Sequence, residues 1–74
     1  MLRVLLCRGH EQVFEGPAVR VVLPGEDGEV SVFAFHAPML CTLGTGEVVV
    51  DEARFPVRGG VARVARDAVT ILAC

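Results

Sequence analysis

Residues 23–40 read L-P-G-E-D-G-E-V-S-V-F-A-F-H-A-P-M-L, and they hold two turns separated by a short apolar run. The first turn opens with a Pro-Gly pair, in which proline lacks a ladder donor and glycine tolerates positive φ. An acidic tip follows at 26–29, and a strand-like run at 30–35 leads to a second turn at 36–38. The stretch contains no catalytic motif. It predicts a presented edge with a charged tip, as in a binding or coupling module.

Short apolar runs alternate with turn signals along the whole chain, which is typical of a β-sandwich or barrel. No window of about twelve residues shows the 3.6-residue period of a helix. We therefore expect one all-β domain over residues 1–74, with about eight to ten short, mostly antiparallel strands. The expected strands cover residues 2–7, 12–15, 18–23, 30–33, 39–43, 47–51, 54–58, 61–65 and 69–72.

Glycine and proline set the expected strand boundaries. Gly16-Pro17 and Pro24-Gly25 should each end a strand, and the Gly-Thr-Gly run at 44–46 should end another. Gly59-Gly60 predicts a two-residue hairpin turn. Pro56 indicates a free edge or a bulge, because proline cannot donate to a ladder.

Side-chain alternation predicts which residues face inward. Phe33, Phe35 and Phe55 are expected in the core, with Phe35 partly exposed because it lies beside the turn at His36. The other expected core residues are Val19, Val21, Val57, Val69 and Ile71.

Composition excludes several classes of protein. The 74 residues carry a net charge of −2, and the seven basic residues are all Arg and dispersed, which argues against nucleic-acid binding. No apolar run approaches the ~20 residues needed to span a bilayer, so we expect no direct membrane insertion. The start of the chain lacks a signal-peptide pattern, which favours a cytosolic protein. Three widely spaced Cys without a zinc pattern are expected as reduced thiols.

Five motifs occur in a characteristic order along nearly the whole chain. They are V-F-E-G (13–16), V-x-L-P-G-E-D-G-E (21–29), H-A-P-M-L (36–40), R-G-G-V (58–61) and V-T-I-L-A (69–73). This ordered set resembles the N-terminal β-sandwich domain of the ε subunit of F-type ATP synthases, called δ in mitochondria. The resemblance implies a flattened β-sandwich in the central stalk, which binds the γ subunit and the c-ring as part of the rotor. It implies a non-catalytic subunit without a cofactor, at the cytoplasmic face of the bacterial inner membrane.

The resemblance also implies two sets of interface residues. The c-ring set is Glu26, Asp27, Glu29, Val30, Ser31 and His36. The γ set is Arg8, Met39, Leu40, Cys41 and Arg58. The family often has Pro-Gly just before His-Ala-Pro, where this chain has Ala34-Phe35.

Family members usually continue into a helical hairpin that inhibits ATP hydrolysis and in some cases binds ATP. The sequence ends where the sandwich ends, so we expect no inhibitory hairpin and no ATP binding. An isolated short helix would be marginal in any case.

Other functions are weighed against this one. The acidic tip lacks the alternating ligands and closing bidentate Glu of a Ca²⁺ loop, so no metal is expected. The Gly-rich turns lack the Lys of a P-loop, so no phosphate or other specific small-molecule ligand is expected. A stand-alone β-sandwich binding module is one rival. A small enzyme that uses His36 with Cys41 is a second, and it would require a lowered thiol pKa.

Overall fold

The computed structural model describes residues 1–74 and contains seven strands and no helix. The strands are β1 (Leu2–Arg8), β2 (Glu11–Ala18), β3 (Arg20–Gly25), β4 (Gly28–Phe33), β5 (Met39–Val50), β6 (Ala53–Ala65) and β7 (Ala68–Ala73). They form one hydrogen-bonded sheet in the order β2-β1-β7-β6-β5-β3-β4. All neighbours are antiparallel except the parallel pair β1 and β7. The all-β prediction is confirmed, with fewer strands than expected.

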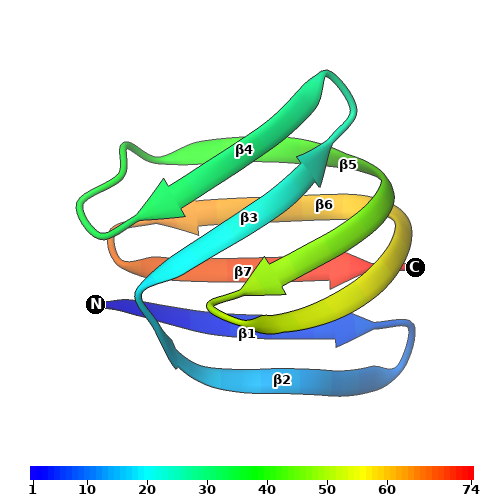
Figure 1. Ribbon diagram of the computed structural model, residues 1–74, viewed down its shortest axis with the longest axis horizontal. Helices are drawn as coiled ribbons and strands as arrows, with labels where there is room; N and C mark the ends of the chain where they lie inside the picture. Colours follow the sequence, from blue (N-terminus) through cyan, green and yellow to red (C-terminus); the bar gives the residue numbers. More distant parts are fainter.

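The sheet folds over on itself because β5 and β6 are long enough to run through both of its layers. They contain 12 and 13 residues, and they curve together around one side of the molecule (Figure 1). Only the later part of β6, Gly60–Ala65, pairs with β7. The earlier part of β6 and the later part of β5 continue into the second layer, where β3 and β4 follow. A sandwich therefore arises from one continuous sheet.

The glycines that were expected to end strands instead bend them. β5 and β6 stay paired on both sides of the bend, with Leu43 opposite Gly60 and Thr45 opposite Arg58. Gly60 has φ 127°, and a Cβ there would lie 2.2 Å from the carbonyl oxygen of Leu72. Only glycine permits β6 to pass this close to β7. The hairpin prediction at Gly59-Gly60 is wrong, and two pairs of expected strands merge.

The proline positions are explained by strand edges. Pro17 lies within β2, opposite Arg3, whose N–H points away toward the carbonyl oxygen of Asp67. No ladder donor is required from Pro17, so the predicted break at Gly16-Pro17 is wrong. Pro24 lies within β3, which ends at Gly25, so the predicted strand end at Pro24-Gly25 is confirmed. Pro56 lies in the part of β6 that has β5 on one side and no strand on the other, so the free-edge prediction is confirmed.

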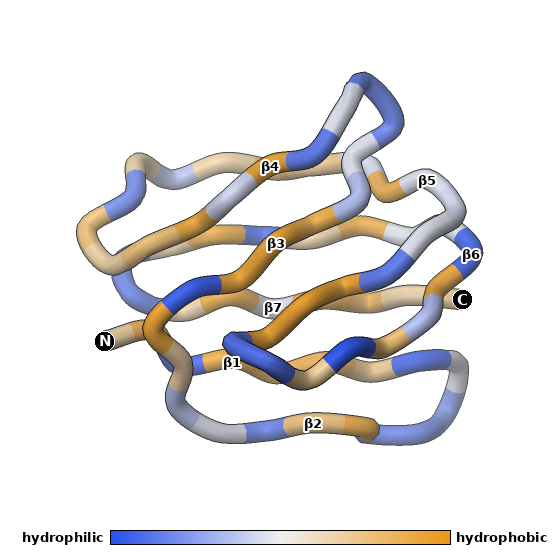
Figure 2. The backbone as a smooth tube through the Cα atoms, viewed as in Figure 1, coloured by the Kyte–Doolittle hydropathy of each residue, from blue (hydrophilic) through white to orange (hydrophobic).

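The core lies between the two layers and is apolar throughout. Val21, Val57, Val69 and Ile71 are buried as expected. The full set of buried hydrophobic residues is Leu2, Val4, Leu6, Ala18, Val21, Leu23, Val32, Cys41, Leu43, Val48, Val50, Val57, Ala62, Val64, Val69, Ile71 and Ala73. Figure 2 shows the matching hydrophobic colouring along the middle of β3 and the end of β5.

Three expected core residues differ in the structure. Val19 is 62% exposed, because it lies in the corner between β2 and β3 rather than within a strand. Phe33 is 51% exposed, because it lies on the outer face of β4. Phe55 is only partly buried, and its ring packs against Phe14 with centroids 5.8 Å apart. Phe35 was expected to be partly exposed and is 92% exposed.

No helix in the structure could span a membrane.

Candidate functional site

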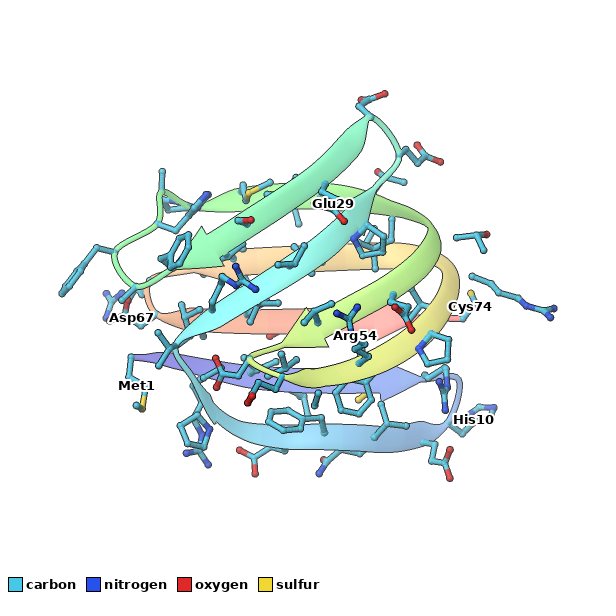
Figure 3. The ribbon with its side chains drawn as sticks, viewed as in Figure 1. Met1, His10, Glu29, Arg54, Asp67 and Cys74 are labelled. Carbon is cyan, nitrogen blue, oxygen red and sulfur yellow. The ribbon has the colours of Figure 1, made fainter.

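The acidic tip is the turn of the β3–β4 hairpin. Glu26 and Asp27 form the two-residue turn between the paired Gly25 and Gly28. A Cβ on Gly25 would lie 2.6 Å from the carbonyl oxygen of Gly28, so the turn closes only with glycine there. The carboxylates of Glu26, Asp27 and Glu29 are exposed, and the hydrophilic tip projects from the body of the sandwich (Figures 2 and 3).

A backbone hydrogen bond ties this tip to the neighbouring strand. The N–H of Glu26 donates to the carbonyl oxygen of Thr42 with an N···O distance of 2.9 Å. The pairing between β3 and β5 is irregular between Val22 and Gly25, where Pro24 has no N–H to donate. The bond from Glu26 restores contact with β5 beyond this irregularity.

A hollow opens between the tip and the beginning of β5, and it joins residues from both predicted interfaces. Glu26, Asp27 and Val30 of the c-ring set line it on one side. Met39, Leu40 and Cys41 of the γ set line it on the other. The sequence could not show that the two sets meet, because they come from different strands.

The rest of the γ set lies elsewhere. Arg8 and Arg58 line a second hollow, beside Cys74 and Pro56. The Arg8 guanidinium donates to the carbonyl oxygen of Pro56 with an N···O distance of 2.8 Å. The backbone N–H of Arg58 donates to the carbonyl oxygen of Cys74, and its exposed side chain has no carboxylate partner. The predicted γ set therefore divides between two places.

Three members of the c-ring set, Glu29, Ser31 and His36, lie outside the first hollow. Glu29 is exposed on β4. Ser31 is exposed on the outer face of β4. His36 is partly buried in the loop between β4 and β5, where its Nδ1 lies 2.7 Å from the carbonyl oxygen of Ala37. That contact engages one ring nitrogen with the backbone of the loop.

The Cys41 thiol in the hollow has a shifted pKa. Burial raises the pKa of the Cys41 thiol, and the negative charge of Asp27 raises it further. An activated nucleophile requires the opposite shift, because the thiolate is the reactive form. The thiol Sγ instead lies 3.7 Å from the carbonyl oxygen of Thr42. This direction of the pKa shift contradicts the small-enzyme alternative.

The contact that holds the loop after β4 was not predicted from the sequence. Phe35 has φ 65°, a left-handed conformation that is uncommon for a non-glycine residue. Its N–H donates to Oδ1 of Asp67, 3.1 Å away in the turn between β6 and β7. The Pro-Gly that the family often has at this place was the available signal, since glycine adopts this conformation freely.

A second missed feature is an apolar patch on the outer face of β5, β6 and β7. Leu40, Val61 and Leu72 are exposed there, and they line a shallow hollow with Arg63 and Thr70. Only Leu40 belongs to a predicted interface. The outward alternation against buried Ala62 and Ile71 was the signal in the sequence.

Comparison with known proteins gives a family match along the full chain. A model of the family "ATP synthase, Delta/Epsilon chain, beta-sandwich domain" matches residues 1–74. The chain is 40% identical over 67 residues to "ATP synthase epsilon chain 2" of Burkholderia orbicola, covering 82% of this chain and 44% of that protein. It is 41% identical over 69 residues to "ATP synthase epsilon chain" of Nitrosomonas europaea, covering 86% of this chain and 49% of that protein. The chain thus spans about half the length of these curated relatives.

Solved structures give the same fold. A chain of the Euglena gracilis mitochondrial ATP synthase (OSCP/F1/c-ring) has a TM-score of 0.89 and 23% identity, covering 97% of this chain and 49% of that one. A chain of the Tetrahymena thermophila mitochondrial ATP synthase (central stalk/c-ring) has a TM-score of 0.76 and 17% identity, covering 97% and 62%. At these identities the likeness concerns the fold alone.

Proposed function

Because the chain belongs to the ATP synthase delta/epsilon β-sandwich family, we propose that it acts in the central stalk of an F-type ATP synthase. There it joins the γ subunit to the c-ring as part of the rotor. The observation that carries this proposal is the family match over residues 1–74, together with relatives that are named ATP synthase epsilon chains. The location follows from the role: a peripheral position at the cytoplasmic face of the bacterial inner membrane.

The role is mechanical and involves no chemistry by this chain. Its site is an acidic tip and a hollow lined by both acidic and apolar residues, and its one buried thiol has a raised pKa rather than a lowered one. ATP turnover and ion passage belong to other subunits of the complex. No cofactor and no specific small-molecule ligand enter the proposal.

The fold suits the transmission of force. The β3–β4 hairpin pairs with β5, and β5 continues through the bend into the other layer. A load applied at the tip therefore passes along continuous strands and their ladder hydrogen bonds. The bond from Glu26 to Thr42 adds a direct connection between the tip and β5.

The tip is the proposed c-ring contact, through the c-ring set named above. Exposed carboxylates accept charge-assisted hydrogen bonds from Arg side chains or backbone amides of a partner. The proposed γ contact divides into the wall formed by Met39, Leu40 and Cys41 and the arginines Arg8 and Arg58. Apolar side chains and arginine are both frequent at protein interfaces.

A co-purification experiment tests this proposal. The tagged 74-residue chain is mixed with a γ–c-ring assembly and recovered through its tag. We expect γ and the c subunit to be retained in a saturable manner. A chain that binds another partner as a stand-alone module would leave both subunits in the flow-through.

A further inference from the structure

The outer edge of β4 is an unpaired strand edge. β4 is the last strand in the sheet order and pairs only with β3. The carbonyl oxygen of Arg20 accepts a hydrogen bond from the N–H of Asp51, so the backbone N–H and C=O groups of Arg20 point toward the β5 side of β3. Alternation along β3 and β4 then directs the N–H and C=O groups of Glu29, Ser31 and Phe33 away from β3. No backbone or side-chain hydrogen bond uses these groups outside the strand ladders.

The two edges of the sheet differ in how well they are protected. The edge strand β2 carries Pro17 and is irregular between Leu6 and Cys7 of its neighbour. Proline and bulges are common devices that prevent edge-to-edge pairing. β4 has no proline, no basic residue and an unbroken pairing with β3. Its edge is therefore open to another extended strand.

The outer face of β4 carries an aromatic ring at one end and a carboxylate at the other. Phe33 lies opposite Arg20 of β3, and the two side chains share the outer face. Glu29 lies on the same face, near the tip. The ion pairs of the chain are Arg3–Glu15 and Arg54–Glu47. Arg20 and Glu29 are both exposed, and neither has an ionic partner within the chain.

We propose that two free copies of this chain pair through their β4 edges, antiparallel and related by a two-fold axis. When Ser31 lies opposite Ser31 of the second copy, Glu29 of that copy lies opposite Phe33. Three side chains then lie side by side across the joined sheet: Arg20 and Phe33 of one copy, followed by Glu29 of the second copy. The Arg and Glu side chains meet across the aromatic ring, and the two-fold axis repeats the contact.

This arrangement selects a second copy rather than an arbitrary peptide. Arg20 of β3, which lies beside one end of the β4 edge, and Glu29 at the other end of that edge are complementary in charge to the same edge reversed. The outward groups of three residues on each copy supply about six interchain hydrogen bonds. The two acidic tips lie at opposite ends of the paired strands, so their charges stay apart. Since Glu29 is also a proposed c-ring contact, the ring and the second copy compete for it.

Analytical ultracentrifugation of the 74-residue chain from about 10 μM to about 1 mM tests the pairing. We expect the average mass to rise from 7.9 kDa toward twice that value as the concentration increases. A monomer mass throughout this range would overturn the inference. The proposed role in the stalk would survive that result, because c-ring binding needs only the monomer.

Substitutions locate the contact. Ser31→Pro removes an outward donor without removing a bond to β3, and it should weaken pairing about tenfold or more. Arg20→Glu and Glu29→Arg should each weaken pairing about tenfold, because each opposes like charges across both copies of the contact. The Arg20→Glu/Glu29→Arg double variant restores opposite charges and should recover pairing to within about threefold. Arg63→Glu, at an exposed and unpaired arginine on the outer face of β6 and away from β4, is the matched control and should leave pairing unchanged.

Circular dichroism accompanies each variant to establish that it is folded. If Ser31→Pro unfolds the chain, the two charge reversals and their double variant decide the question. A dimer that tolerates both reversals, or a double variant that fails to recover pairing, would assign dimerisation to another surface and contradict the inference.

Discussion

The backbone N–H of Glu26 donates to the carbonyl oxygen of Thr42, which ties the acidic tip of the β3–β4 hairpin to β5. Thr42 follows Cys41, which is buried in the hollow beneath the tip. The most exposed part of the candidate site is thus one hydrogen bond from a strand that runs through both layers.

Gly60→Ala should destabilise the fold strongly. The added Cβ would collide with the Leu72 carbonyl oxygen at a φ that side chains rarely adopt, so β6 could no longer pass β7. We expect a loss of about 3 kcal/mol or more in the free energy of unfolding, measured by urea denaturation. Gly9→Ala is the control: φ is also positive there, but the site is open, so the loss should be about 1 kcal/mol. Equal losses at the two sites would contradict the role of Gly60 as the bend.

Phe35→Gly should leave the fold as stable or stabilise it by up to about 1 kcal/mol. The ring is 92% exposed, so little burial is lost, and glycine relieves the strain of φ 65°. Thermal unfolding measures the change. Phe33→Gly is the matched comparison, because Phe33 lies within β4, where glycine weakens a strand. A clear destabilisation by Phe35→Gly would mean that this ring packs against the protein.

Phe55→Ala should cost about 2–3 kcal/mol, less than the ~3–5 expected for a fully buried aromatic ring. Its ring is only partly buried, but it packs against Phe14 at a centroid distance of 5.8 Å. A double-mutant cycle with Phe14→Ala should give a coupling of about 0.5–1.5 kcal/mol. Additive losses would show that the two rings do not interact in solution.

Stability should fall as the pH rises above the ordinary thiol pKa of 9.0, in part through Cys41. The raised pKa means that the folded chain keeps a proton that the unfolded chain has lost. The thiol's stabilising contribution is therefore complete below the unfolded pKa and is lost as the pH rises through the folded pKa. Urea midpoints from about pH 7 to about pH 10.5 should decline less steeply in Cys41→Ala than in the parent.

Two further variants test the causes of that decline. Asp27→Asn should reduce the alkaline decline only in part, because burial raises the thiol pKa more than the carboxylate does. Cys74→Ala, at the exposed end of β7, is the control for general thiol effects. An unchanged alkaline decline in Cys41→Ala would contradict the assignment.

The sequence predicts where strands lie better than it predicts which of them join into one longer strand. Alternation placed Val21, Val57, Val69 and Ile71 correctly in the core, because within a strand the inward face repeats every second residue. Gly59-Gly60 was misread as a turn. A glycine pair is equally suited to a turn and to a bend, and the choice here depends on the Leu72 carbonyl, which approaches from another strand.

The sequence located the acidic tip but could not show how the residues of the two predicted interfaces are arranged. The acidic tip lies within a single hairpin, so local turn chemistry was enough to locate it. The contact of Asp27 with the Cys41 hollow, and the separation of Arg8 and Arg58 from it, depend on how β3, β5 and β6 are ordered in the sheet. Val19 was misplaced because a corner exposes a residue that alternation alone would bury. Phe33 was misplaced because its hydrophobicity was weighed above its position, which shares the outer face of β4 with Ser31.

The proposed rotor role is tested most sharply by binding to the isolated c-ring and to γ in parallel, for the parent chain and for Glu26→Lys/Asp27→Lys/Glu29→Lys. The three carboxylates are exposed, so the triple variant should stay folded, with a stability change of less than about 0.5 kcal/mol per site. If the tip contacts the ring, affinity for the c-ring falls at least about tenfold while affinity for γ stays within about twofold. Unchanged affinity for the c-ring in the triple variant, or no binding of the parent chain to either partner, would contradict the proposed coupling of γ to the ring through this tip.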